Sequence, residues 1–220
     1  MPRIFSHSLL VVCLAWVSAF SHAEQSSPLA ERFVEGVHYE AIEIPVATRD
    51  ADKIEVVEMF SYACVHCYNF DPYVKAWRTK QSDDVDFRLV PAIFNADWEK
   101  LAAAYYTADA LGVVDQVHED MFTGIHQRNE DLRQPTVIFP LFKRNAEVDE
   151  ESFYAAWNSF SIRSRVQQAK ALGRAYGITG VPTMVVNGKY RVDGRMAGGN
   201  VAMLEVVDFL VAKERTNAAQ

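Results

Sequence analysis

Two cysteines three residues apart, Cys64 and Cys67, are the residues of this chain best suited to covalent chemistry. They enclose Val65 and His66, and they follow an apolar segment with the composition of a buried strand. If a helix begins at Cys64, its first turn brings both sulfur atoms to one face, where they can form a disulfide. The pattern therefore predicts a reversible dithiol–disulfide pair.

A helix N-terminus gives the two cysteines different properties. Free backbone N–H groups and the helix dipole favour a thiolate at Cys64, and a positive charge on His66 lowers the pKa of that thiol further. We expect Cys67, one turn inward, to be more buried and to attack a mixed disulfide formed at Cys64. An inert structural disulfide is one alternative. A zinc site is another, but structural zinc needs four protein ligands, and we expect His118 and His126 to lie on a solvated helix face.

Glu58 is an acid within an otherwise apolar strand, six residues before Cys64. Strand alternation could point its side chain beneath the helix that carries the cysteines. A buried carboxylate there could shuttle a proton as Cys67 reacts, because burial raises its pKa. The alternative is an acid near a strand end that reaches solvent.

Val181 and Pro182 precede a second apolar strand, far along the chain. Most X–Pro bonds are trans, and an ordinary proline at a strand edge is one interpretation. A cis bond would instead turn the backbone of Val181 outward beside the disulfide. An extended substrate could then pair with Val181 by strand addition.

The elements that position these residues form an α/β pattern interrupted by helices. Alternating and β-branched segments predict strands, and apolar residues at helical spacing predict helices. The expected strands cover 39–45, 54–60, 85–91, 183–186 and 189–192. The expected helices cover 64–80, 97–112, 113–129, 135–145, 149–159, 161–177 and 200–213, with Asp97 as the N-cap of the second.

The first 23 residues have the organisation of a cleavable secretory signal peptide. Arg3 precedes an apolar run at 9–20, and Ser21-His22-Ala23 follows it with small residues at the cleavage positions. An uncleaved N-terminal anchor is the alternative. Cleavage would leave two cysteines in an oxidising compartment. The 220-residue chain carries a net charge of −7, which argues against nucleic-acid binding.

Two segments, 60–70 and 180–190, together resemble the DsbA family of periplasmic thiol:disulfide interchange proteins. The resemblance spans nearly the whole mature chain, because the helical interruption matches the insertion that this family carries in a thioredoxin fold. It implies an α/β, thioredoxin-like fold with an inserted all-helical domain. The thioredoxin-like domain would comprise 39–96 and 172–215, and the helical insertion 97–171.

The resemblance also implies roles for the site residues. Cys64 would be the nucleophilic cysteine, Cys67 the resolving cysteine, and Pro182 the cis-proline that follows Val181. Glu58 falls on the position of the family's buried acid.

Two positions of the chain are matched less closely. Val65 departs from the family's commonest dipeptide, Pro-His, which leaves the mechanism intact but the redox potential open. His66 of that dipeptide is kept. Lys100 corresponds only loosely to the family's lysine near the buried acid.

The implied function is a periplasmic protein-disulfide oxidoreductase. It would donate the Cys64–Cys67 disulfide to newly secreted proteins through a mixed disulfide, as a monomer and with no cofactor. A quinone-linked membrane oxidase resembling DsbB would reoxidise it. We expect Trp98, Tyr105 and Tyr106 to pack in the core rather than to line a substrate surface.

Two other functions remain open. A disulfide reductase or isomerase would use the same cysteine pair, but the isomerases that resemble this family carry threonine where this chain has Val181, and a separate dimerisation domain. A non-enzymatic peptide binder would keep the disulfide as a structural element only.

Overall fold

The computed structural model of this chain describes Met1 and residues 32–218. The predicted signal peptide therefore lies outside the described residues, apart from Met1. The described part contains one mixed sheet in the order β1-β5-β4-β2-β3. Its strands are β1 (Glu40–Ala41), β2 (Ile54–Phe60), β3 (Val85–Pro91), β4 (Thr183–Val186) and β5 (Tyr190–Asp193). Strands β2 and β3 are parallel, and the other neighbouring pairs are antiparallel.

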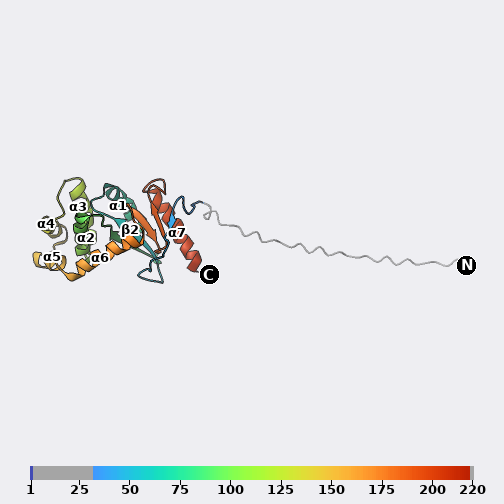
Figure 1. Ribbon diagram of the computed structural model, residues 1–220, viewed down its shortest axis with the longest axis horizontal. Helices are drawn as coiled ribbons and strands as arrows, with labels where there is room; N and C mark the ends of the chain where they lie inside the picture. The colour runs from blue at the N-terminus through green and yellow to red at the C-terminus, as the bar shows by residue number, and fades with distance from the viewer. Residues whose placement is uncertain (2–31, 219–220) are drawn as a thin grey trace.

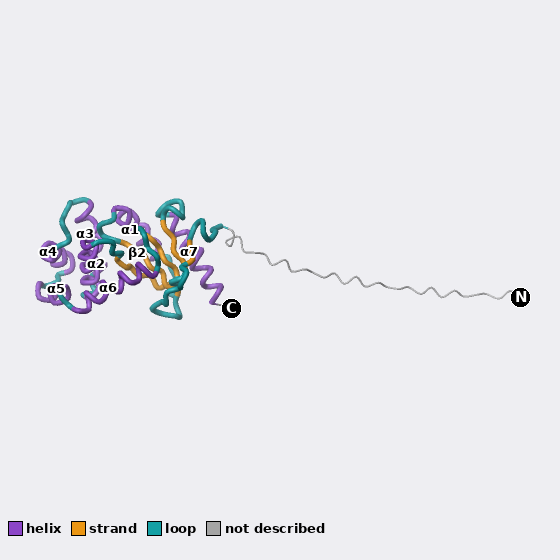
Figure 2. Tube along the Cα trace, viewed as in Figure 1, coloured by secondary structure: helices purple, strands orange, loops and turns teal. Residues whose placement is uncertain are grey.

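Helices cover both faces of this sheet (Figures 1 and 2). Helix α1 (Val65–Arg78) connects the parallel strands β2 and β3, and α7 (Ala202–Ala218) packs beside it on the same face, where both share one apolar cluster. The C-terminal half of α6 (Phe160–Ala175) covers the opposite face. There Gly173 lies against Met59, since a Cβ at Gly173 would be 3.6 Å from the end of the Met59 side chain. The sheet is therefore buried on both sides.

Strand β2 shows how the alternation of side chains assigns its residues to the two faces. All seven of its residues are buried, as the sequence predicts for a central strand. Ile54 and Val56 belong to the cluster formed with α1 and α7, whereas Val57 and Met59 belong to the cluster on the α6 side. The two-residue period of a strand therefore places Glu58 on the face that α1 covers.

The chain between β3 and β4 forms a helical insertion at one end of the molecule, on the left in Figure 1. Its helices are α2 (Ala96–Ala110), α3 (Val114–His126), α4 (Pro135–Ala146), α5 (Glu150–Trp157) and the first half of α6. Aromatic residues such as Phe142 and Phe153 fill its core, and Tyr105 and Tyr106 are buried there as expected. The limits 97–171 remain a prediction, but the α/β class with a helical insertion is confirmed.

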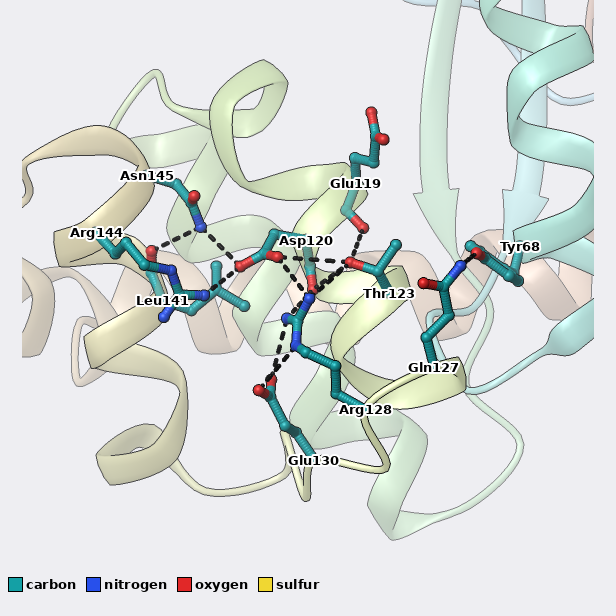
Figure 3. Close-up of polar contacts among 10 residues, drawn as sticks. All are labelled: Tyr68, Glu119, Asp120, Thr123, Gln127, Arg128, Glu130, Leu141, Arg144 and Asn145. Carbon is teal, nitrogen blue, oxygen red and sulfur yellow. Dashed lines mark hydrogen bonds and ion pairs between the residues drawn. The ribbon is translucent and has the colours of Figure 1, made fainter.

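Asp120 of α3 joins two helices of the insertion through its carboxylate (Figure 3). It accepts hydrogen bonds from Arg144 and, at 2.8 Å, from Asn145, both on α4. Arg128, in the connection after α3, forms an ion pair with the same carboxylate at 2.9 Å. These charge-assisted contacts fix the direction of α4 against α3.

Most elements begin or end within three residues of their expected bounds, and three differences have a clear structural reason. Strand β1 covers two residues only, because beyond Ala41 isolated hydrogen bonds, such as that from the Ile42 N–H to the Lys189 carbonyl, replace a regular ladder. Helix α2 is capped by Asn95 and not by Asp97. The Asn95 side chain accepts the backbone N–H of Trp98 at 3.0 Å, so the helix begins earlier.

Helix α7 extends five residues beyond its expected end at residue 213, to Ala218. The buried Glu214 accounts for the difference. Its carboxylate accepts hydrogen bonds from Asn187 at 2.5 Å and from Lys189 at 2.6 Å, which lie at the turn between β4 and β5. A partner distant in sequence therefore prolongs this helix, which local periodicity does not reveal.

Glu55 and Arg88 form a buried ion pair between β2 and β3. Glu55 is 1% exposed, and Arg88 donates two hydrogen bonds to its carboxylate, at 2.9 and 3.1 Å. The more exposed Arg49 makes longer contacts with the same carboxylate, at 3.5 Å from its side chain and 3.4 Å from its backbone N–H. The paired geometry keeps a charge within the sheet without leaving it unsatisfied.

We expect Arg88→Met to lower the free energy of unfolding by about 3 kcal/mol, because the Glu55 carboxylate would stay buried without its main partner. Urea unfolding measures the change. The double variant Glu55→Met/Arg88→Met is the matched control, and it should regain much of the loss because neither charge remains. Equal stability of Arg88→Met and the wild type would contradict the prediction.

Candidate active site

The two cysteines lie where β2 ends and α1 begins, close to the helical insertion (Figure 1). Cys64 is the N-cap of α1 and has the extended backbone of a cap residue, with φ −95° and ψ 115°. It is partly exposed, whereas Cys67 in the first turn is buried, and both are free thiols. The difference in exposure agrees with the one expected from the sequence.

The surroundings of Cys64 stabilise a thiolate. A hydrogen bond from the Cys67 thiol is the largest cause that lowers the pKa of Cys64, to about 6. The backbone N–H groups of Cys67 and His66 and the positive charge of His66 act in the same direction, against an opposing contribution from burial. His66 itself is exposed at the rim of the site. At neutral pH the sulfur of Cys64 is therefore mostly ionised.

The surroundings of Cys67 have the opposite effect. Burial is the main cause that raises the pKa of this thiol far above its ordinary range. Its hydrogen bond to Cys64 and the negative charge of Glu58 raise the pKa further. Cys67 therefore holds its proton, and the two sulfur atoms differ strongly in nucleophilic character.

The loop before β4 brings Val181 and Pro182 to Cys64 across 117 residues of sequence. The thiol of Cys64 lies 3.4 Å from the Val181 carbonyl oxygen, and the Val181–Pro182 peptide bond is cis. The hydroxyl of Thr183 donates to the Gly180 carbonyl at 2.8 Å and closes the loop. The backbone of Val181 therefore borders the reactive sulfur.

Glu58 lies beneath α1, with 3% of its surface exposed. It is paired in register with Leu89 of β3 and Met184 of β4. Burial, followed by the negative charge of Asp71, raises the pKa of Glu58 to about 8. The group facing Cys67 from the sheet is therefore a carboxylic acid that keeps its proton near neutral pH.

Lys100 does not neighbour this acid. It lies on α2, is substantially exposed, and forms an ion pair with Asp97 at 3.3 Å. The charges that act on Glu58 come from Asp71, Arg78 and Cys64. The loose correspondence of Lys100 to a lysine near the buried acid is therefore wrong for this chain.

The interpretation of His118 and His126 as residues of a solvated helix face is also wrong. His118 is buried, and His126 is partly buried, with its Nε2 atom 2.8 Å from the Tyr62 carbonyl oxygen. Phe122 lies four residues from each histidine and is buried between them. The spacing of four residues could have indicated that both histidines lie on the buried face, because residues at i, i+4 and i+8 share one helix face.

Sequence reasoning missed the partners of these histidines altogether. Tyr62 and Asp71, on either side of the cysteine motif, both form hydrogen bonds with His118. They lie 56 and 47 residues from it along the chain, so no local pattern connects them. Among the described residues, no group of three or more His, Cys, Asp or Glu side chains could hold a metal ion.

Comparisons with known proteins agree with this geometry. The family of DSBA-like thioredoxin domains matches residues 55–211. The thiol:disulfide interchange protein DsbA of Pseudomonas aeruginosa is 40% identical over 210 residues, which cover 96% of this chain and 97% of that protein. The DsbA of Azotobacter vinelandii is 39% identical over 209 residues, which cover 94% and 97% of the two chains.

Solved structures give the same result for the fold. The crystal structure of Pseudomonas aeruginosa DsbA superposes with a TM-score of 0.83 at 39% identity, covering 87% of this chain and 99% of that one. The oxidoreductase DsbA of Xylella fastidiosa gives a TM-score of 0.77 at 36% identity, over 83% and 98% of the two chains. From its cysteine motif, its fold and its relatives, this chain belongs to the DsbA family of thiol:disulfide oxidoreductases with a thioredoxin-like fold.

Proposed function

We propose that this chain oxidises pairs of thiols in other proteins, with its own Cys64–Cys67 disulfide as the oxidant and no cofactor. The opposite pKa shifts of the two cysteines carry this proposal. A thiolate that is stable at Cys64 lowers the free energy of the reduced form, so the disulfide becomes a strong electron acceptor.

The reaction begins with a thiolate of the substrate. It attacks the partly exposed sulfur of Cys64, the Cys64–Cys67 bond breaks, and Cys67 departs with the electron pair. A second thiolate of the substrate then attacks the substrate sulfur of the mixed disulfide and releases Cys64 as a thiolate. The substrate has gained one disulfide and lost two electrons, and the enzyme has gained both.

Glu58 supplies the proton that the departing Cys67 needs. A thiolate at Cys67 is unstable in its buried position, since burial raises the pKa of that thiol. With its pKa near 8, Glu58 holds a proton near neutral pH that it can transfer to Cys67 as the disulfide opens. It recovers a proton from solvent afterwards.

Val181 and Pro182 provide the backbone on which a substrate segment lies. An extended peptide whose cysteine reaches Cys64 passes the Val181 backbone, where it can pair as an added strand. A groove of about 350 Å³ lies nearby. Thr179, two residues before Val181, and the exposed side chain of Phe94 are among the residues that line it. Pairing through the backbone and apolar contact suits a broad range of unfolded substrates.

We place this activity in the periplasm, after export through the predicted signal peptide. The relatives carry the name thiol:disulfide interchange protein. The reduced enzyme needs an electron acceptor, and we assign that role to a quinone-linked membrane oxidase resembling DsbB. None of the helices in the described part of the chain has the length and apolar composition of a membrane span.

Variants of the two cysteines test the different roles proposed for them in the reaction. We expect Cys64→Ala to abolish oxidation of a dithiol peptide, because the attacked sulfur is gone. Cys67→Ala, first converted to its glutathione mixed disulfide, should exchange glutathione for a peptide with a single cysteine and keep the peptide bound. Mass spectrometry detects this adduct, and dithiothreitol should release it. Full oxidising activity of Cys64→Ala would contradict the proposal, and a wild type that binds the peptide without oxidising it would instead support a non-enzymatic peptide binder.

The redox equilibrium of the mature protein in glutathione buffers tests the direction of the reaction. We expect a potential of about −120 mV, the value of a DsbA, because the Cys64 thiolate stabilises the reduced form. The ultraviolet absorbance of the thiolate should rise with pH around 6, the pKa of Cys64. A potential of about −270 mV, that of thioredoxin, would contradict the proposal and indicate a reductase.

Glu58→Gln should stabilise the folded protein in a manner that depends on pH. The pKa of Glu58 rises from 4.5 to about 8 on folding, so the wild type loses stability as the pH rises through this interval. We expect the variant to be more stable by about 3 kcal/mol at pH 7 and equal to the wild type below about pH 4.

Urea unfolding across this pH range measures the stability difference. Glu55→Gln in the same strand is the matched control, and it should destabilise the protein because Glu55 is paired with Arg88. Without the carboxyl group, oxidation of a dithiol peptide should slow by about a hundredfold or more. An unchanged rate would remove Glu58 from the proposed proton transfer.

A further inference from the structure

His118 is a buried titratable residue that the proposed reaction does not use. It lies on α3 of the helical insertion with 5% of its surface exposed. Its ring packs against Phe60 and Phe122, with centroid distances of 5.6 and 5.1 Å. Both ring nitrogens nevertheless have hydrogen-bond partners, which shows that this polar side chain is accommodated specifically.

The partners of the two nitrogens determine which one carries the proton in the neutral ring. The Nε2 atom lies 3.1 Å from the Asp71 carboxylate, which can only accept, so Nε2 is the donor. The Nδ1 atom is then an acceptor, and the Tyr62 hydroxyl donates to it at 2.9 Å. Burial alone would raise the pKa of Asp71, but His118 and Lys75 outweigh it and lower that pKa.

These two contacts link the insertion to both sides of the cysteine motif. Tyr62 lies two residues before Cys64, and Asp71 lies four residues after Cys67, in the second turn of α1. One ring on α3 therefore bridges the segment that enters the motif and the helix that leaves it.

A second pair of contacts lies about two turns further along, at the C-terminal end of α3. The ring of His126 stacks on Tyr68, with centroids 5.2 Å apart, and Gln127 donates a hydrogen bond to the Tyr68 hydroxyl (Figure 3). Tyr68 directly follows Cys67. The start of α1 is therefore held by α3 along two turns, and His118 is the more buried of the two histidines.

We propose that His118 is a positioning residue for the active site, which acts through Tyr62 and Asp71 on the thiolate of Cys64. The inference rests on the proposed function, because it concerns the group that makes the disulfide oxidising. The Tyr62 contact fixes the segment before Cys64, and with it the cap position of that residue. The Asp71 contact fixes a negative charge on the inner side of α1.

The negative charge of Asp71 affects the Cys64 thiolate indirectly, by changing the pKa of Glu58. After burial, Asp71 is the largest cause that raises the pKa of Glu58, so it helps to keep that acid neutral. If Asp71 turned toward solvent, Glu58 would ionise more readily. The resulting negative charge would lie within electrostatic reach of Cys64 and would disfavour its thiolate.

Two variants separate the contacts of the ring. In His118→Gln the side-chain amide can take the place of Nε2 and donate to Asp71, whereas in His118→Asn the amide can take the place of Nδ1 and accept from Tyr62. Phe142→Leu is the control. It perturbs the insertion core at a fully buried residue of α4 without changing a polar contact of α1.

Titration of the Cys64 thiolate in the reduced full-length mature protein is the measurement, with thermal unfolding beside it. We expect His118→Asn to raise the pKa of Cys64 by about 0.5 to 1 unit and to make the disulfide less oxidising. His118→Gln should stay closer to the wild type. Phe142→Leu should lower thermal stability and leave the pKa of Cys64 unchanged.

A rise of the pKa of Cys64 in both histidine variants also supports the proposal, since both contacts are then required. The proposal is wrong if both variants keep the wild-type value, or if Phe142→Leu shifts it equally. Failure of the proposed function is a separate result. In that case the wild type itself would show an ordinary pKa for Cys64 and a redox potential that is not oxidising.

Discussion

The hydrogen bond from Cys67 to the sulfur of Cys64 joins two groups whose environments differ strongly, and the chemistry of the site depends on that difference. Cys64 caps a helix and receives N–H groups and a nearby positive charge, so its thiolate is stable. Cys67, three residues later, is enclosed by apolar side chains, so its thiol keeps its proton. One turn of helix separates a stable thiolate at Cys64 from a buried thiol at Cys67 that keeps its proton. Both features stabilise the reduced pair, so a disulfide between the two cysteines is readily reduced by a thiolate that attacks Cys64.

Strand β2 contains two buried acids that serve different purposes. Glu55 is paired with Arg88, so its charge is compensated and contributes to the sheet. Glu58 lies three residues further along, where alternation turns it toward α1, and no cation offsets its burial fully. The same burial that makes an unpaired carboxylate unfavourable makes it a proton donor near neutral pH. The sheet thus tolerates one acid through pairing and the other through protonation.

The helical insertion contributes more than a cover for the sheet. Its helix α3 provides His118 and His126, which contact Tyr62 on one side of the cysteines and Asp71 or Tyr68 on the other. The network around Asp120 holds α3 against α4 (Figure 3). The insertion is therefore connected through α3 to the residues on either side of the cysteines, at the start of α1.

Local sequence alone predicted the strand that ends before Cys64, the helix that begins there and the greater burial of Cys67. These features depend on periodicity and on helix-end chemistry, which act over a few neighbouring residues. A family resemblance in two segments added the thioredoxin-like fold and the cis bond at Pro182.

Tertiary structure alone decided the environment of His118, the exposed position of Lys100 and the carbonyl of Val181 beside Cys64. Each of these depends on partners brought together from tens of residues away or more. Such partners are selected by how the sheet and the insertion close on each other, because burial and electrostatic interactions act through space and leave no periodic pattern along the chain.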